Sequence, residues 1–410
     1  MNNKHWAIFT NNASKKNNFI ASLLNGKVSS GFNELRNKKG SLFSKSVLED
    51  YMRKEEQHGR KIITNTAQNL KTMSSGERQK ALLAHVLENK PDYLILDNPF
   101  DNLDIDTQIE LKRKLQNMRH EISLVQLISR KSDLLPFVNT FFKLEINDLV
   151  TVEKVSITKR LQEKKMFRNK IPPPLKPFDF GEKVLIELKN INVSYSERPI
   201  LKNINWKIQK GDFWELRGKN GSGKTTILSM ITGENPKGYG QELYIFGQKK
   251  GSGESVWDIK RRIGYFTPAM TDKFTGYHSV QNMVISGLTD SLGLYIRPTE
   301  SQLRVAKDWL LLLGLWHLKD KLYHDLTIGQ RRLIMCARAM IKHPVLLILD
   351  EPTAGLDDES AELFVALVNK FASESETAIV FVSHRQEPNL NPDFIYELKM
   401  GNEGSTGSVH

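Results

Sequence analysis

Two stretches of the chain share one order of hydrophobic and polar positions. In each, a helix-like pattern ends at a proline, and a run of four apolar residues then leads into an acidic residue. The apolar runs are YLIL at 93–96 and LLIL at 346–349. Short, wholly apolar runs are typical of parallel strands covered on both faces. The pattern therefore predicts an α/β fold in each half of the chain.

The two stretches are copies of one unit. Residues 74–104 align with 327–357 without a gap, and every matched pair is 253 residues apart. The identical pairs used for the alignment are Gly76 and Gly329, Arg78 and Arg331, Pro91 and Pro344, Asp97 and Asp350, and Asp104 and Asp357. We therefore expect two domains of the same fold in tandem.

The first copy is shorter at its front and in its middle. Lys16 and Lys224, which follow equivalent loops, are 208 residues apart, 45 fewer than the repeat requires. Alternating strand-like residues precede the second loop, and almost nothing precedes the first. We predict a degenerate domain at 1–150 without the front sheet and most of the middle helices, and a complete domain at 182–401. A basic, proline-rich linker is predicted at 151–181 and a flexible tail at 402–410.

The second half carries a phosphate-binding loop. GKNGSGKT at 218–225 fits G-x-x-x-x-G-K-[ST], between an apolar strand and a helix-like run. Glycines let backbone N–H groups approach phosphate oxygens, while the lysine reaches the β- and γ-phosphates and the hydroxyl binds Mg²⁺. A glycine-rich turn without function is the competing interpretation, and the agreement of strand, loop, lysine and hydroxyl argues against it. The predicted nucleotide-binding residues of this loop are Gly218, Asn220, Gly221, Ser222, Gly223, Lys224, Thr225 and Thr226.

Polar residues at the ends of two predicted strands complete the candidate site. Asp350 is expected to join Thr225 as a Mg²⁺ ligand, and Glu351 to accept a proton from the attacking water. His384 follows the apolar run IVFV and is expected near the γ-phosphate, although a lone histidine is more often structural. Tyr195 has two interpretations, stacking on a base or packing within a sheet.

Composition and charge set limits on the class of protein. The chain has 410 residues, of which 39% are hydrophobic and 26% charged, as in ordinary globular proteins. Its start shows no signal-peptide pattern and its single cysteine, Cys336, cannot form an internal disulfide, so a cytoplasmic location is expected, with peripheral association with the inner membrane left open. The formal charge of +12 fits a polyanionic partner or an ordinary solvated surface.

These motifs resemble those of twin-cassette ATP-binding-cassette (ABC) ATPases. GKNGSGKTT resembles Walker A, VLLILDE Walker B, AGLD the D-loop, and His384 the switch histidine, while MSSGE at 73–77 and LTIGQ at 326–330 resemble the signature. The runs GYHSVQNMVISG and DSLGLY are similar to those of the soluble cassettes called ModF or photorepair protein PhrA. The resemblance implies ATP and Mg²⁺ as cofactors, Tyr195 as the adenine platform, and a signature contributed in trans by Ser74, Ser75, Gly76 and Glu77.

The resemblance also implies that the two composite sites are unequal. The Walker A of the second half pairs with the nearly intact signature of the first half. The loop of the first half has Thr10, Ala13 and Lys15 at the glycine positions, and it faces a signature with Thr327 and Ile328. Asn17, Asn98 and Ser129 stand where the magnesium hydroxyl, the base and the histidine are expected. We therefore predict one competent site and one inactive site.

Three functions fit this reading. The first is a soluble ATPase, transport-associated or regulatory as in the ModF type. The second is the motor subunit of an ABC transporter bound to a membrane permease, against which the glutamine position holds Thr267 and Pro268. The third is an ABC-F-like ribosome or translation factor, against which the linker is short and interrupted by prolines. A nucleic-acid partner is therefore not favoured, and dimerisation is left open.

Overall fold

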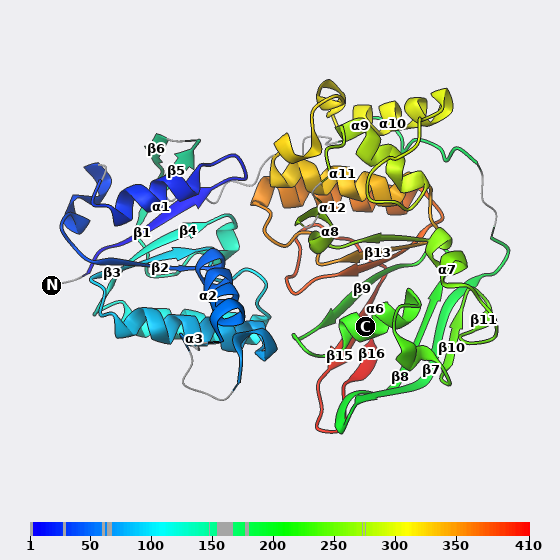
Figure 1. Cartoon of the computed structure of the whole chain (residues 1–410), viewed down its shortest axis with the longest axis horizontal. Helices are drawn as coiled ribbons and strands as arrows, with labels where there is room; N and C mark the ends of the chain where they lie inside the picture. Colours follow the sequence, from blue (N-terminus) through cyan, green and yellow to red (C-terminus); the bar gives the residue numbers. More distant parts are fainter. Residues whose placement is uncertain are drawn as a thin grey trace. The chain divides into compact units, whose positions relative to one another are not determined.

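The computed structural model describes residues 3–27, 30–59, 62, 63, 68–146, 148–153, 167–176, 180–272, 274 and 276–410. Contacts divide the chain into two compact units (Figure 1). The first comprises Met1–Gln162 and Gly355–Asp358, and the second Glu163–Ala354 and Glu359–His410.

The first unit is built on a six-stranded sheet. Its order is β2-β3-β4-β1-β5-β6, and the neighbouring strands are parallel except for the antiparallel pair β5 and β6. The strands are β1 (His5–Thr10), β2 (Gly40–Ser44), β3 (Tyr93–Asp97), β4 (Ser123–Ile128), β5 (Thr140–Glu145) and β6 (Asp148–Thr151). The helices are α1 (Lys16–Leu24), η1 (Ser30–Leu35), α2 (Lys45–His58), η2 (Leu70–Thr72), α3 (Ser75–Glu88), α4 (Ile105–Met118) and η3 (Lys131–Asp133).

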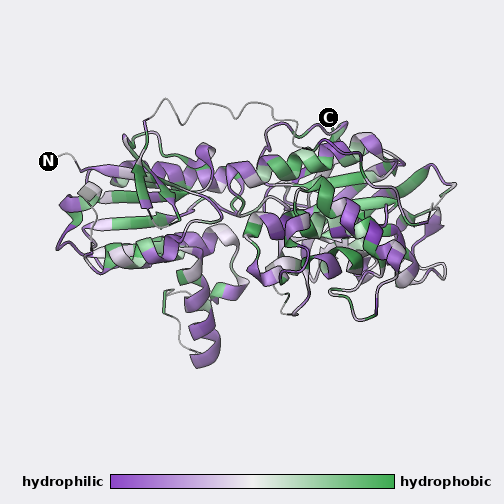
Figure 2. Cartoon of the chain, turned by 90° about the horizontal axis from the view of Figure 1, so that it is seen from above, coloured by the Kyte–Doolittle hydropathy of each residue, from purple (hydrophilic) through white to green (hydrophobic). Residues whose placement is uncertain are grey.

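Both faces of this sheet are covered, which explains its apolar strands. Successive strand side chains point to opposite faces, so in β1 Trp6 packs with α1 and η1, and Ala7 packs with α2, α3 and α4. In η1, Phe32 lies with its ring centroid 5.4 Å from that of Trp6 and 5.3 Å from that of Phe142. Figure 2 shows the hydrophobic colour concentrated in the strands. A short 3₁₀ segment thus closes a face that a whole sheet covers in the second unit.

The second unit contains a sheet of the same order together with a four-stranded antiparallel sheet. The six-stranded sheet, in the order β12-β13-β14-β9-β15-β16, comprises β12 (Ile263–Phe266), β13 (Leu346–Asp350), β14 (Ala378–Val382), β9 (Phe213–Gly218), β15 (Phe394–Lys399) and β16 (Thr406–Val409). The antiparallel sheet, in the order β11-β10-β7-β8, comprises β11 (Gln248–Lys249), β10 (Glu242–Ile245), β7 (Val184–Tyr195) and β8 (Arg198–Gln209). Its side chains share a core with those of α6 and β9.

The helices of the second unit follow the same plan, with more of them between β12 and β13. The helices are α6 (Lys224–Ile231), η4 (Pro236–Gly238), α7 (Val256–Arg262), α8 (Pro268–Asp272), α9 (Val280–Ile285), η5 (Ser286–Leu288), α10 (Glu300–Leu312), η6 (Trp316–Leu318), η7 (Tyr323–Asp325), α11 (Ile328–Met340) and α12 (Asp358–Glu374). No helix in the described part of the chain is long and apolar enough to cross a membrane.

The repeat extends to unusual backbone conformations. Non-glycine residues rarely adopt a positive φ. Lys90 has φ 45° and His343, 253 residues later, has φ 48°; Asn98 and Glu351 form a second such pair with φ 45° and 51°. Matching sheet orders and matching strained positions confirm two α/β domains of one fold in tandem.

The linker is described in part, and the tail differs from the prediction. Much of the predicted linker, including Lys159, Arg160, Lys164 and Lys165, lies outside the described residues. Its proline segment packs on the second unit, where the Ile171 N–H donates to Glu374 Oε2 (2.8 Å) and His343 Nε2 lies 2.7 Å from Pro172 O. The predicted flexible tail is wrong, because residues 406–409 form β16 and pair with β15.

Candidate active site

The phosphate loop lies between β9 and the N-terminus of α6, where backbone N–H groups are free of intrahelical partners. Gly223 caps the helix with φ 95°, a left-handed conformation that glycine adopts without strain. A Cβ at Gly223 would lie 2.5 Å from Leu201 Cδ2, and one at Gly218 would lie 2.5 Å from Ser222 Oγ. The backbone path of this loop therefore requires glycine at both positions.

Lys224 begins α6 and is held across the loop. Its side chain is buried, and Nζ donates to the backbone oxygens of Gly218 (2.7 Å) and Lys219 (3.0 Å). Thr225 follows it and is exposed, and Thr226 is half-buried. The ammonium and the hydroxyl therefore lie at the positive end of the helix, as the motif predicts.

Asp350, Glu351 and His384 come together at the carboxyl ends of β13 and β14. Glu351 has φ 51° and its N–H donates to Val382 O at 2.9 Å, which turns its side chain out of the strand. Glu351 Oε1 forms an ion pair with His384 Nε2. The structure thus brings the predicted base and the predicted histidine into direct contact.

Asp350 is poorly suited to carrying an isolated charge. Burial, and then the adjacent negative charge of Glu351, raise the pKa of its carboxyl to about 6. A cation would relieve both effects, and Mg²⁺ usually takes one or two protein oxygens together with phosphate oxygens. The Asp350 carboxylate and the Thr225 hydroxyl fit this donor set. No group of three or more ligating His, Cys, Asp or Glu residues occurs among the described residues.

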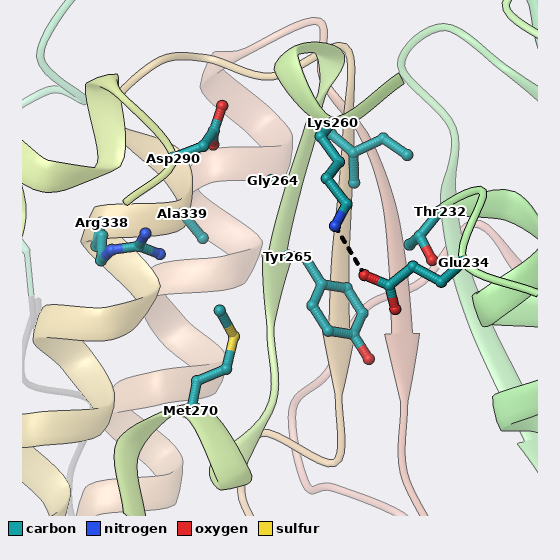
Figure 3. A pocket seen from close by; sticks show the side chains of 10 residues that line it. Thr232, Glu234, Lys260, Gly264, Tyr265, Met270, Asp290, Arg338 and Ala339 are labelled. Carbon is teal, nitrogen blue, oxygen red and sulfur yellow. Dashed lines mark ion pairs between the residues drawn. The ribbon is translucent and has the colours of Figure 1, made fainter. Parts of the chain in front are cut away.

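Tyr265 connects Asp350 to a cavity of about 160 Å³. Its hydroxyl donates to Asp350 Oδ2 at 3.4 Å. Figure 3 shows its ring beside the ion pair of Lys260 and Glu234, which are 3.0 Å apart, with Met270 on the opposite side of the cavity. The sequence analysis missed Tyr265, because only the three-dimensional pairing of β12 with β13 brings it to the acidic residue.

Tyr195 lies at the end of β7 and is 44% exposed. Asn235 Nδ2 donates to its hydroxyl (2.8 Å) and to Ser229 Oγ in α6 (3.0 Å). The Lys237 ammonium lies 5.6 Å from the centroid of its ring. The tyrosine is therefore tied to the helix of the phosphate loop. Asn235 and Lys237 were missed, and the only signal in the sequence was a polar turn after the helix.

The equivalent positions of the first unit hold different chemistry. Lys16 begins α1 as Lys224 begins α6, but its Nζ forms an ion pair with Asp97 Oδ1 at 2.9 Å. Asn98 has the backbone conformation of Glu351, and its N–H likewise donates to the next strand, at Leu127 O. Its side-chain amide bonds to Ser129 Oγ at 2.9 Å. An amide paired with a hydroxyl thus replaces the carboxylate paired with an imidazole.

The signature residues of the first unit form the start of α3. Ser74 is the N-cap, and Ser74 and Glu77 form a capping box in which each side chain accepts from the backbone N–H of the other. Ser75 begins the helix. A Cβ on Gly76 would lie 3.0 Å from Thr107 Cγ2, so the helix packs closely there. These residues belong to the first unit, whereas the phosphate loop belongs to the second.

Comparisons with known proteins agree with these motifs. The family described as ABC transporter matches residues 201–354. ABC transporter ATP-binding protein ModF of Escherichia coli (strain K12) is 36% identical over 331 residues, which are 77% of this chain and 67% of that protein. An uncharacterized ABC transporter ATP-binding protein of Schizosaccharomyces pombe is 30% identical over 330 residues, which are 77% of this chain and 65% of that protein. The chain therefore spans about two thirds of the length of these relatives.

A structural likeness covers almost the whole chain. The archaeal ribosome recycling factor aABCE1, solved with the ribosomal stalk protein aP1, has a TM-score of 0.62 at 15% identity and covers 98% of this chain and 85% of its own. An identity this low shows the fold alone. With a phosphate loop, a paired glutamate and histidine, and a relative 36% identical over most of its length, the chain belongs to the ABC family of ATP-hydrolysing cassette proteins.

Proposed function

We propose that this chain hydrolyses ATP at one competent site and serves as a transport-associated or regulatory ATPase of the ModF type. The observation that carries the proposal is the difference between two equivalent positions. In the second unit Glu351 pairs with His384, whereas in the first unit Asn98 pairs with Ser129. An amide cannot accept a proton from water at neutral pH, so the first pair lacks a general base.

Each residue of the competent site has a role in this proposal. Lys224 and the loop N–H groups bind the β- and γ-phosphates, and Tyr195 stacks on adenine. Thr225 and Asp350 would hold Mg²⁺, which would supply positive charge to the phosphates. Glu351 takes a proton from the attacking water, and His384 orients that carboxylate and contacts the γ-phosphate. Ser74, Ser75 and Gly76 supply the signature that completes the site.

In the first unit the loop lysine already has a carboxylate partner. Lys16 is the counterpart of Lys224, and its ammonium is already neutralised by Asp97. Thr10, Ala13 and Lys15 stand at its glycine positions, so the loop lacks the residues that let backbone N–H groups wrap around phosphate. We infer that the first unit contributes a signature and a framework rather than a second catalytic centre.

The two other functions have less support. At the glutamine position expected of transporter motors, Pro268 instead begins the short helix α8, which weakens the case for a membrane permease as partner. The whole-chain likeness to the ribosome recycling factor concerns the fold alone and does not favour a ribosomal role. Cofractionation with membranes and cosedimentation with ribosomes in the presence of ATP separate both alternatives from the proposal.

The central experiment replaces Glu351 by glutamine. We expect Glu351→Gln to lower turnover by about 10²–10⁴-fold, the usual contribution of a general base, while ATP stays bound at one site per chain. ATP hydrolysis and equilibrium binding of labelled ATP are the measurements, and Asn98→Asp is the matched control in the first unit. Retained turnover in Glu351→Gln, or two bound ATP per chain, would contradict the proposal.

A further inference from the structure

One residue anchors the segment that leads into the signature of the first unit. Both its backbone N–H and its backbone carbonyl form hydrogen bonds with side chains. Leu70 is 1% exposed and lies four positions before the cap residue Ser74. Its N–H donates to Glu55 Oε2 at 3.1 Å, and its carbonyl oxygen accepts from Arg78 Nε at 2.7 Å. Arg78 Nη2 also donates to Lys71 O at 2.7 Å. The backbone from Leu70 to the signature is therefore fixed between α2 and α3.

The second unit holds the same segment differently. Tyr323 is 253 residues after Leu70, and both residues begin a three-residue 3₁₀ helix. The Tyr323 N–H donates to the backbone oxygen of His278 at 3.0 Å, and Leu322 forms an isolated bridge with Ser279. Arg331 Nε, the counterpart of Arg78 Nε, has no hydrogen-bond partner among the described residues. In the second unit, backbone contacts with His278 and Ser279 therefore replace the side-chain contacts that Glu55 and Arg78 make in the first unit.

The different solution follows from the shortened middle of the first unit. Between β12 and η7 the second unit has α8, α9 and α10, and His278 lies just before α9. Between β2 and η2 the described part of the first unit has only α2. The described part of the first unit therefore has no counterpart of the His278 carbonyl to accept from Leu70, and a buried N–H without an acceptor is costly. Glu55 on α2 supplies the acceptor.

Glu55 is unusual for its helix. The other acidic residues of α2 are Glu49, Asp50 and Glu56, whose side chains are 58%, 50% and 52% exposed, whereas Glu55 is 9% exposed. Its Oε1 is buried, and it has no hydrogen-bond partner among the residues that the structure describes. A carboxylate is expensive to bury, so its presence here indicates a specific requirement for an acceptor.

We propose that Glu55 is a positioning residue for ATP hydrolysis, acting through Leu70 to hold Ser74–Gly76 in the conformation that completes the competent site. The inference rests on the proposed function, in which that signature serves the phosphate loop of the second unit. Glu55 touches neither ATP nor the reacting water. Its removal therefore affects the step that needs the signature and leaves the binding of ATP to Lys224 and the loop intact.

The test compares three variants of the full chain. Glu55→Leu removes the acceptor at similar volume, Glu55→Gln keeps a carbonyl oxygen that accepts from Leu70, and Glu49→Leu changes the same charge on the exposed face of α2. We expect kcat to fall by about tenfold or more in Glu55→Leu, with the Kd for ATP changed less than about twofold. Glu55→Gln and Glu49→Leu should keep kcat within about threefold of the parent.

Amide hydrogen exchange supplies a readout independent of turnover. The Leu70 amide should be protected in the parent protein and in Glu55→Gln, and should exchange faster in Glu55→Leu. Unchanged kcat in Glu55→Leu, an equal loss in Glu55→Gln, or weakened ATP binding together with lost turnover would each overturn the inference. If Glu351→Gln retains turnover instead, the proposed function itself fails, whatever the result at Glu55.

Discussion

At the scale of single residues, Lys16 occupies the position of a phosphate-loop lysine and forms an ion pair with Asp97. Its ion pair with Asp97 is partly exposed, the lysine side chain by 37% and the aspartate by 11%. We expect Lys16→Ala to leave turnover close to that of the parent and to lower the stability of the first unit by no more than about 1 kcal/mol, since exposed pairs contribute little. ATP hydrolysis and a thermal unfolding midpoint are the measurements. A loss of turnover as large as in Glu351→Gln would show that the first loop takes part in catalysis.

Tyr195 should control the affinity for ATP and not the chemical step. Removing a stacking aromatic usually costs about 1–3 kcal/mol, which is about 5- to 150-fold in affinity. We expect Tyr195→Ala to raise the KM for ATP within that range with little change in kcat. Tyr277→Ala, which removes an 84% exposed tyrosine of the same unit, is the control and should change neither constant. A loss of kcat in Tyr195→Ala would place the residue in the chemistry.

At the scale of elements, the start of α3 should be sensitive to bulk. A side chain at Gly76 must pass Thr107, whose Cγ2 would lie 3.0 Å from the new Cβ. We expect Gly76→Leu to lower kcat by about tenfold or more and to leave ATP binding at the second unit unchanged. Ile328→Ala, at the start of α11 in the equivalent sequence of the second unit, is the matched control. Parent-like rates in Gly76→Leu would contradict the role of this signature.

Sequence patterns predicted the elements that occur in both units. They did not predict the contacts that take the place of segments absent from the first unit. The apolar runs predicted β3 and β13, and the 253-residue offset related α3 to α11, because both signals are local. The covering of the sheet by Phe32 and the acceptor at Glu55 depend on contacts between residues far apart in sequence. The strand β16 was missed for the same reason, since its Gly- and Ser-rich sequence gains its structure from pairing with β15.

The site residues divide in the same way, into those that a local motif predicts and those that only folding brings together. Residues in contiguous motifs, such as Lys224 and Glu351, could be named from the sequence, because motif and backbone geometry coincide there. Tyr265 and Asn235 could not, because each reaches the site through a strand or turn that is adjacent only after folding. The sequence showed only that Asn98 and Ser129 differ from Glu351 and His384. The structure adds that Asn98 and Ser129 contact each other, as the other two residues do.

At the scale of the whole molecule, the two units carry complementary halves of one proposed site, and their covalent connection should decide how that site forms. Two units on one chain meet at an effective concentration of about millimolar when the connection is short. We therefore expect the two units of one chain to pair with each other at micromolar protein concentration.

The measurement is a mixing experiment with Glu351→Gln, which keeps its signature, and Gly76→Leu, which keeps its base. The mixture should hydrolyse ATP no faster than the sum of its parts. A rate restored toward that of the parent would show instead that the site forms between two chains, with the intact signature of one variant serving the intact phosphate loop of the other. The parent mixed with an excess of the double variant Gly76→Leu/Glu351→Gln is the control, because its rate falls only if chains exchange partners.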